Sequence, residues 1–231
     1  MINLQTKFNS CRYFPKLAIL IVLGLLLGAC IPGQRAFSGT ELTANNEAPG
    51  FVLTDQFGEQ VSLYSKRGSV VALTFIYTRC SDICPLTTIS LKQAYNMLGQ
   101  DTEKVEFIAV SVDPDGDTPE STYDFLRNLG MLDVMSFLTG SHDDLSKIWN
   151  EYHIAVVTQS AGSSESALDK LTGELISVAN KPQTSETSAQ KYLKIHSAPV
   201  YLIDQHGKLR SIITDFTSNP ERLVHDVKLV I

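Results

Sequence analysis

Two nearly continuous apolar runs, residues 70–77 and 105–112, limit most strongly what this chain can fold into. Both are rich in β-branched and aromatic residues, which is typical of strands that are covered on both faces of a sheet. Residues 84–98 lie between them and carry apolar side chains near helical spacing, with Pro85 in the first turn and Gly99 after the last. The order strand, helix, strand predicts an α/β fold.

Shorter segments extend this pattern over the rest of the chain. Residues 48–63 contain two short apolar pieces around a glycine turn, which predicts a hairpin, and a second hairpin is expected from residues 200–203 and 209–213. The remaining elements are expected as a helix that Thr118 caps and Pro119 opens, a strand over 135–138, a helix over 143–152 and a last helix from Pro220. They predict one central mixed sheet flanked by helices. With 231 residues, of which 43% are apolar, the chain can bury one sizeable core, so we expect one domain over residues 47–231.

Residues 158–190 interrupt this domain. They are rich in Ser, Thr, Gln and Ala, and residues 171–178 form their one apolar patch. A segment of this composition can bury little apolar surface. We therefore expect an exposed insertion that is partly mobile.

The N-terminal 30 residues have the features of a bacterial lipoprotein signal peptide. Three cations precede an apolar run over residues 17–27, which is too short to span a bilayer comfortably. The run ends in Leu27-Gly28-Ala29-Cys30, which resembles a lipobox whose cysteine receives diacylglycerol. We expect residues 1–29 to be removed, Cys30 to be lipidated and residues 30–46 to form a flexible tether. An uncleaved membrane anchor is the alternative, and both place the domain on the extracytoplasmic side of a bacterial cell membrane.

The charge balance argues against a nucleic-acid partner. Lys and Arg total 19 against 25 Asp and Glu, a net charge of −6, so no basic excess exists to neutralise phosphates. The four cysteines, at positions 11, 30, 80 and 84, do not form the framework of a disulfide-stapled fold. Cys11 precedes the expected cleavage point, so Cys80 and Cys84 carry the thiol chemistry of the domain.

Cys80 and Cys84 lie where the first buried strand meets the first helix. Backbone N–H groups at a helix start are unpaired and the helix dipole is positive there, so thiolates are favoured. Two thiolates in this place can bind one soft metal ion or close into a disulfide. An inert buried pair is the weaker alternative, because a polar Ser-Asp lies between the cysteines. A structural zinc site is not expected, because the chain has no second cysteine pair.

Four ordered blocks of sequence resemble the Sco/SenC family over roughly residues 47–231. They are residues 73–85 with Cys80-Ser81-Asp82-Ile83-Cys84-Pro85, residues 111–120 with Ser111-Val112-Asp113-Pro114 and Asp117-Thr118-Pro119-Glu120, residues 138–141, and residues 196–204, which begin with His196-Ser197. The resemblance implies a thioredoxin-like fold with an N-terminal hairpin. It also implies a membrane-tethered copper metallochaperone that helps to assemble the CuA centre of cytochrome c oxidase.

The same resemblance implies the ligands and the partners. Cys80, Cys84 and His196 are expected to hold copper, since Cu(I) prefers soft thiolates and Cu(II) gains from an added imidazole. The partner is then the oxidase subunit that bears CuA, or another copper chaperone. Asp113 and Pro199 are candidates for supporting the site, and Pro199 occupies the position where thioredoxins place a cis proline facing their cysteines.

The chain departs from the family pattern at three positions. Ser81 stands where the family commonly has Pro, Ile195 where it has Asp, and Gly116 where it often has Arg. Ile195 removes a carboxylate that would contact the copper histidine. The other four histidines, at positions 142, 153, 206 and 225, are expected to be structural or solvated.

Two further functions stay open at this stage. A thiol:disulfide oxidoreductase would reduce the cysteines of an apo copper site with Cys80 and Cys84, and it would not need His196. A peroxidase is the weaker idea, since Arg79 is the one local candidate for activating Cys80. On the copper hypothesis, the chain is a chaperone and not an enzyme with turnover.

Overall fold

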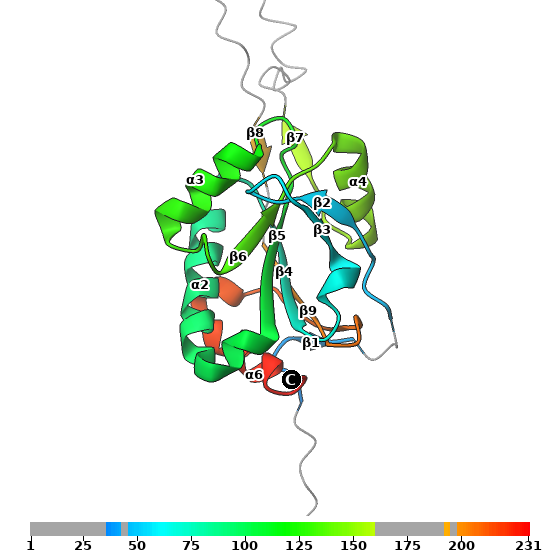
Figure 1. Ribbon diagram of the computed structural model, residues 1–231, viewed down its shortest axis with the longest axis vertical. Helices are drawn as coiled ribbons and strands as arrows, with labels where there is room; N and C mark the ends of the chain where they lie inside the picture. The colour runs from blue at the N-terminus through cyan, green and yellow to red at the C-terminus, as the bar shows by residue number, and fades with distance from the viewer. Residues whose placement is uncertain (1–35, 43–45, 160–191, 195–197) are drawn as a thin grey trace, which may run out of the picture. The chain divides into compact units, whose positions relative to one another are not determined.

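Six strands form one mixed sheet in the order β1–β10–β9–β4–β5–β6 (Figure 1). This computed structural model describes residues 36–42, 46–159, 192–194 and 198–231. Three strands run parallel, namely β4 (Val70–Ile76), β5 (Val105–Ser111) and β6 (Met135–Leu138). The other three pair antiparallel, namely β9 (Val200–Ile203), β10 (Leu209–Ile213) and β1 (Thr40–Glu41). The predicted mixed α/β sheet is confirmed.

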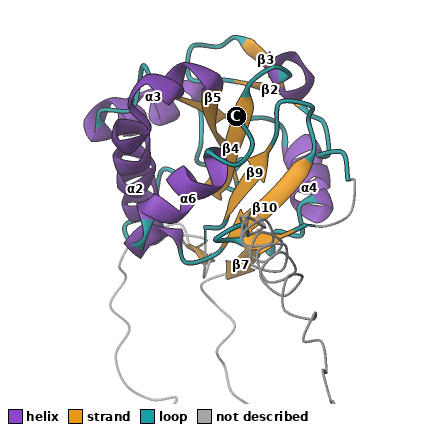
Figure 2. Ribbon diagram, turned by 90° about the horizontal axis from the view of Figure 1, so that it is seen from below, coloured by secondary structure: helices purple, strands orange, loops and turns teal. Residues whose placement is uncertain are grey.

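Helices cover both faces of the sheet, as the apolar strands require (Figure 2). One face packs against α2 (Ile83–Leu98), α3 (Pro119–Leu129) and α6 (Pro220–Val227). The other packs against α4 (His142–Glu151) and the hairpin of β2 (Val52–Thr54) and β3 (Gln60–Ser62). Successive residues of β4 alternate between the two resulting cores. Short 3₁₀ turns occupy Leu63–Lys66, Gly99–Lys104 and Phe216–Ser218.

The helix boundaries follow the expected capping signals closely. Thr118 caps α3 by accepting from the backbone N–H of Ser121, and Pro119 is the first residue of that helix. Gly99 ends α2 with φ of 60°, a conformation that favours glycine. The helix expected over 143–152 begins one residue earlier, because Ser141 caps it by accepting from the backbone N–H of Asp144.

Part of the expected tether belongs to the folded domain. The N-terminal segment, residues 37–42, contributes β1 to the sheet edge beside β10. The backbone N–H groups of Ser38 and Gly39 donate to the fully buried carboxylate of Asp226, at 2.6 and 3.0 Å. A side chain at Gly39 would place its Cβ 2.8 Å from the carbonyl oxygen of Ile212. Residues 37–42 of the predicted tether are therefore folded, because they pair with β10 and donate to Asp226, while residues 30–35 and 43–45 lie outside the described residues.

The side chain of Gln56 hydrogen-bonds to two backbone groups of β6, the strand at the opposite edge of the sheet. The Gln56 amide nitrogen donates to the Met135 carbonyl at 3.1 Å, and the Phe137 N–H donates to the Gln56 amide oxygen at 3.0 Å. Gln56 is only 6% exposed, and both partners are on β6. Its amide takes the place that the backbone of a neighbouring strand would take.

The expected insertion begins and ends in a short antiparallel pair, β7 (Val157–Gln159) and β8 (Tyr192–Lys194). Residues 160–191, and with them most of the predicted insertion, lie outside the described residues. The predicted signal peptide and Cys30 also lie outside them. In the part of the chain that the structure describes, no helix has the length and apolar character needed to cross a bilayer.

Candidate metal centre

Two adjacent loops form the site at the carboxyl ends of β4 and β5. Residues 77–82, the thiol loop, connect β4 to α2, and residues 112–118, the aspartate loop, connect β5 to α3. The two strands are parallel neighbours, and their last residues, Ile76 and Ser111, pair with each other. The two loops therefore leave the sheet side by side, which is the usual location of sites in α/β folds.

The structure brings Cys80 and Cys84 together. Both are free thiols, Cys80 is 8% exposed and Cys84 is fully buried. Cys80 lies in the thiol loop and Cys84 is the second residue of α2, as the sequence predicted. The backbone N–H of Cys84 donates to Cys80 Sγ at 3.4 Å, so the sulfur accepts from one of the unpaired N–H groups of the helix start.

The two thiols differ in their protonation. The pKa of Cys80 is lowered to about 5, chiefly because the Cys84 thiol donates to its sulfur, with the N–H groups of residues 82 and 84 adding to the effect against the cost of burial. The same hydrogen bond, together with burial, raises the pKa of Cys84. Burial and the neighbouring Cys80 charge raise the pKa of Tyr77 to about 12. Cys80 is therefore the more acidic thiol of the pair.

Asp113 is held by an ion pair with the residue that precedes Cys80. Arg79 Nε and a terminal guanidinium nitrogen donate to Asp113 Oδ2 at 2.8 and 2.6 Å. A Cβ atom at Gly116 would lie 2.3 Å from Arg79 Nε and 2.4 Å from Asp113 Oδ2. The glycine thus leaves room for this ion pair. This is a physical reason why the chain has Gly116 where the family often has Arg.

The aspartate loop contributes three polar contacts that the sequence analysis missed. The carboxylate of Asp117 accepts from the backbone N–H and the hydroxyl of Thr78, and also from the hydroxyl of Ser111. Burial raises the pKa of Asp117, while these hydrogen bonds act in the opposite direction. The sequence does contain one indication of these contacts. Thr78 and Ser111 are polar residues at the carboxyl ends of two neighbouring apolar strands, where sites of α/β folds usually lie.

The segment before β9 approaches the same end of β4. The Thr74 hydroxyl donates to the carbonyl of Pro199 at 3.0 Å, and Ala198 belongs to the same cluster of buried side chains as both cysteines. No peptide bond between described residues is cis, so the bond before Pro199 is trans. His196 and Ile195 lie outside the described residues. Within those residues, no three His, Cys, Asp or Glu side chains are grouped to hold a metal ion.

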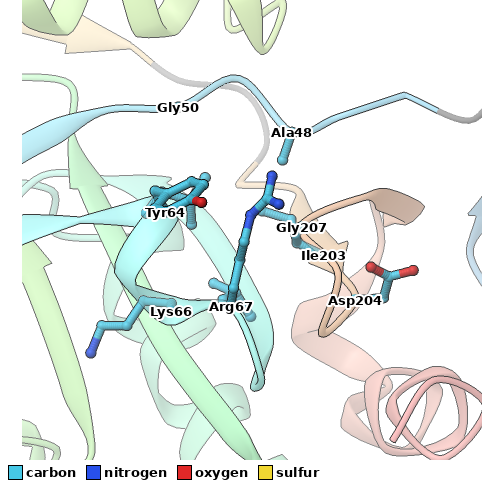
Figure 3. A pocket seen from close by; sticks show the side chains of 10 residues that line it. Ala48, Gly50, Tyr64, Lys66, Arg67, Ile203, Asp204 and Gly207 are labelled. Atoms are coloured by element: carbon cyan, nitrogen blue, oxygen red, sulfur yellow. The ribbon is translucent and has the colours of Figure 1, made fainter.

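The other four histidines, at positions 142, 153, 206 and 225, are all exposed. His225 contacts Ser38 and Asp226, at 3.1 and 3.0 Å, and so has a structural role. The described part of the chain also has a small hollow near the first residues of β4 (Figure 3). The two cations at this hollow are paired, Lys66 with Glu106 and Arg67 with Glu47. No cysteine lines the hollow, so the thiol chemistry lies elsewhere.

The difference between the two thiols has a measurable consequence. Iodoacetamide is expected to alkylate Cys80 with a rate that rises through about pH 5 and is then constant, because the thiolate is the reacting form. Cys84 should react slowly throughout, because it is fully buried, whereas Cys80 keeps 8% of its surface exposed, and because the Cys84 pKa is raised. Peptide mapping by mass spectrometry measures each site separately. A half-rise for Cys80 near the ordinary thiol value of about 8.5 would contradict this prediction.

Comparison with known proteins places this geometry in context. A family model described as SCO1/SenC matches residues 39–231. The SCO1 protein homolog of Bacillus subtilis is 27% identical over 212 residues, which cover 90% of this chain and 96% of the relative.

Solved structures are similar as well. BsSco, described with a disulfide switch and as a member of the Sco family of cytochrome c oxidase assembly proteins, is 26% identical with a TM-score of 0.56, over 85% of this chain and 98% of that one. Bradyrhizobium japonicum ScoI with copper bound is 24% identical with a TM-score of 0.58, over 80% and 100% of the two chains. These similarities confirm the thioredoxin-like fold.

Proposed function

The chain belongs to the SCO1/SenC family, and from this premise we propose that it is a copper-binding metallochaperone that assists assembly of the CuA centre of cytochrome c oxidase. One observation carries the proposal, namely the two adjacent free thiols of Cys80 and Cys84 at the start of α2, where the Cys84 N–H donates to Cys80 Sγ. Soft sulfur donors suit Cu(I), and a site with two thiols and few other donors can release its ion to a partner. BsSco, a relative with the same fold, belongs to the Sco family of cytochrome c oxidase assembly proteins.

In this proposal, copper is the cargo, and Cys80, Cys84 and His196 hold it. The two sulfurs supply the donors for Cu(I), and the imidazole of His196 adds the harder donor that Cu(II) prefers. Support for His196 comes from its neighbours in the chain. Ala198 lies in the same buried cluster as the cysteines, and the Pro199 carbonyl is bonded to β4.

We propose further that the protein is tethered to the extracytoplasmic face of a bacterial membrane through lipidated Cys30. The lipobox-like Leu27-Gly28-Ala29-Cys30 supports this proposal. Its partners are then the CuA-bearing oxidase subunit or another copper chaperone. The ordered N-terminal segment leaves residues 31–36 as the shortest link between the lipid and the domain.

A thiol:disulfide oxidoreductase is the second candidate function. The observation in its favour is the asymmetry of the thiols, because a low-pKa thiolate beside a protonated thiol is the arrangement that attacks and then resolves a mixed disulfide. The disulfide switch of BsSco concerns a relative with the same fold. This function uses Cys80 and Cys84 and does not require copper to bind.

Copper loading of the full-length protein in detergent tests the first function. The reduced, metal-free protein should bind one Cu(I) and, separately, one Cu(II) with a sulfur-to-copper charge-transfer band. Cys80→Ser and Cys84→Ser should each lose the band and weaken Cu(I) binding by at least about 100-fold, since each removes a thiolate donor. The matched control is His206→Ala, which removes an exposed imidazole in the turn between β9 and β10 and should bind like the parent. An unchanged band in either single variant would remove that cysteine from the ligand set.

A further inference from the structure

A buried carboxylate holds the thiol loop in place two residues before Cys80. Asp117 is 5% exposed. Its Oδ1 accepts from the Thr78 backbone N–H at 3.0 Å and from the Thr78 hydroxyl at 2.6 Å. Its Oδ2 accepts from the Ser111 hydroxyl at 2.6 Å. Both oxygens are therefore engaged, and two of the three donors belong to one residue of the thiol loop.

This carboxylate is held without a cationic partner among the described residues. The nearby guanidinium, that of Arg79, is paired with Asp113 instead. Burying a carboxylate costs free energy, which hydrogen bonds from suitably placed donors offset. An apolar residue of similar size would avoid that cost, but it would leave the N–H and hydroxyl of Thr78 without this acceptor.

Asp117 fixes the backbone of the thiol loop more directly than Asp113 does. Asp113 binds the end of a long side chain, and the Arg79 side chain is 47% exposed, so that ion pair is partly screened by solvent. Asp117 binds the main chain of Thr78 itself. The Ser111 hydroxyl also accepts from the Asp113 N–H at 3.0 Å, so the contacts of Asp117 extend into the aspartate loop.

We propose that Asp117 is a positioning residue of the thiol site, which holds the loop through Thr78 so that Cys80 Sγ stays against the N–H groups at the start of α2. The Cys84 N–H donates to Cys80 Sγ at 3.4 Å in the reduced pair, and this hydrogen bond stabilises the dithiol. Loosening the loop should weaken this stabilisation and favour the disulfide. The inference deepens the proposed function, because it concerns the same two thiols.

The equilibrium between the Cys80–Cys84 dithiol and its disulfide tests the proposal in the metal-free protein. Dithiothreitol is the probe: the protein disulfide accepts two electrons and the protons that its thiols bind, while dithiothreitol loses two electrons and two protons and closes into its own disulfide. Asp117→Ala should shift the equilibrium about tenfold toward the disulfide, as expected when a hydrogen bond to a charged group is lost. Asp117→Asn keeps an acceptor oxygen for Thr78 and should stay within about twofold of the parent.

The asparagine variant distinguishes an effect of Asp117 on the position of the thiol loop from an effect of its negative charge. If Asp117 acted only through its negative charge, both variants would relieve repulsion of the Cys80 thiolate and shift the equilibrium toward the dithiol. That result would overturn the proposal, as would a folded Asp117→Ala protein with the parent equilibrium. Asp55→Ala is the matched control, because Asp55 is also buried and accepts from two N–H groups, in the turn between β2 and β3. It should leave the equilibrium unchanged.

A second pair of variants keeps the test decisive if Asp117→Ala does not fold. Thr78→Val removes the hydroxyl donor and retains the shape of the side chain, so it should shift the equilibrium about threefold toward the disulfide. Thr78→Ser restores the hydroxyl and should restore the parent value; equal behaviour of the two variants would overturn the proposal. Copper is absent from these measurements, so failure of the parent to bind copper would contradict the proposed function and leave this inference standing.

Discussion

His196→Ala is expected to abolish stable Cu(II) binding while the Cys80–Cys84 disulfide still forms and reopens. Cu(II) can take an electron from a thiolate ligand, and an imidazole donor stabilises the oxidised ion against that loss. Without the imidazole, two equivalents of added Cu(II) should be reduced to Cu(I) within seconds as the two thiols lose two electrons and two protons and close into the disulfide, so the charge-transfer band should not last. Stopped-flow absorption measures the lifetime of the band, and thiol titration afterwards measures the disulfide.

His206→Ala is the matched control, because His206 is exposed in the turn between β9 and β10. It should retain the parent lifetime of the band. In cells, His196→Ala should fail to assemble CuA at limiting copper, whereas the control should support it. If His196→Ala restores oxidase activity there, the oxidoreductase function is correct and the metallochaperone function is wrong.

Asp226→Ala should lower the free energy of unfolding by about 3 kcal/mol. Asp226 is fully buried and accepts from Ser38, Gly39 and the Ser211 hydroxyl. Its loss leaves these donors without their acceptor and releases the N-terminal segment from β10. For a domain of this size, the melting temperature should fall by roughly 6 to 12 °C.

Calorimetry or thermal circular dichroism measures this change. Asp124→Ala is the matched control, since Asp124 is half-exposed and pairs with Arg127 on the surface of α3, so its removal should cost less than about 1 kcal/mol. A melting temperature of Asp226→Ala within about 2 °C of the parent would mean that the N-terminal segment adds little to stability.

The fold could be predicted largely because its strands carry strong local signals. The apolar runs that became β4 and β5 have both faces buried, so their composition alone distinguishes them from surface strands. Caps and breakers such as Thr118 and Gly99 act within one turn of their own position and are therefore visible in sequence. The strand β1 is different, since two exposed residues form it and their pairing depends on β10, about 170 residues later in the chain.

The site could be predicted only where its residues carry a local signal of the same kind. The cysteines can be recognised as candidate functional residues from their residue type and from their position at a helix start. The role of Asp117 was hidden, because an aspartate just before a helix cap is usually a solvated residue, and its contact with Thr78 spans 39 positions. The Arg79–Asp113 pair was equally hidden, since it depends on the absence of a side chain at Gly116.

Gln56 has a consequence for how this protein can be recognised. By occupying the carbonyl of Met135 and the N–H of Phe137, it leaves β6 without those two groups for β-augmentation by a peptide or by another copy. Cross-β stacking, which begins at unprotected ladders, is blocked at the same place. An approaching strand would meet two backbone groups of this edge that are already hydrogen-bonded, so contacts at this place are left to side chains.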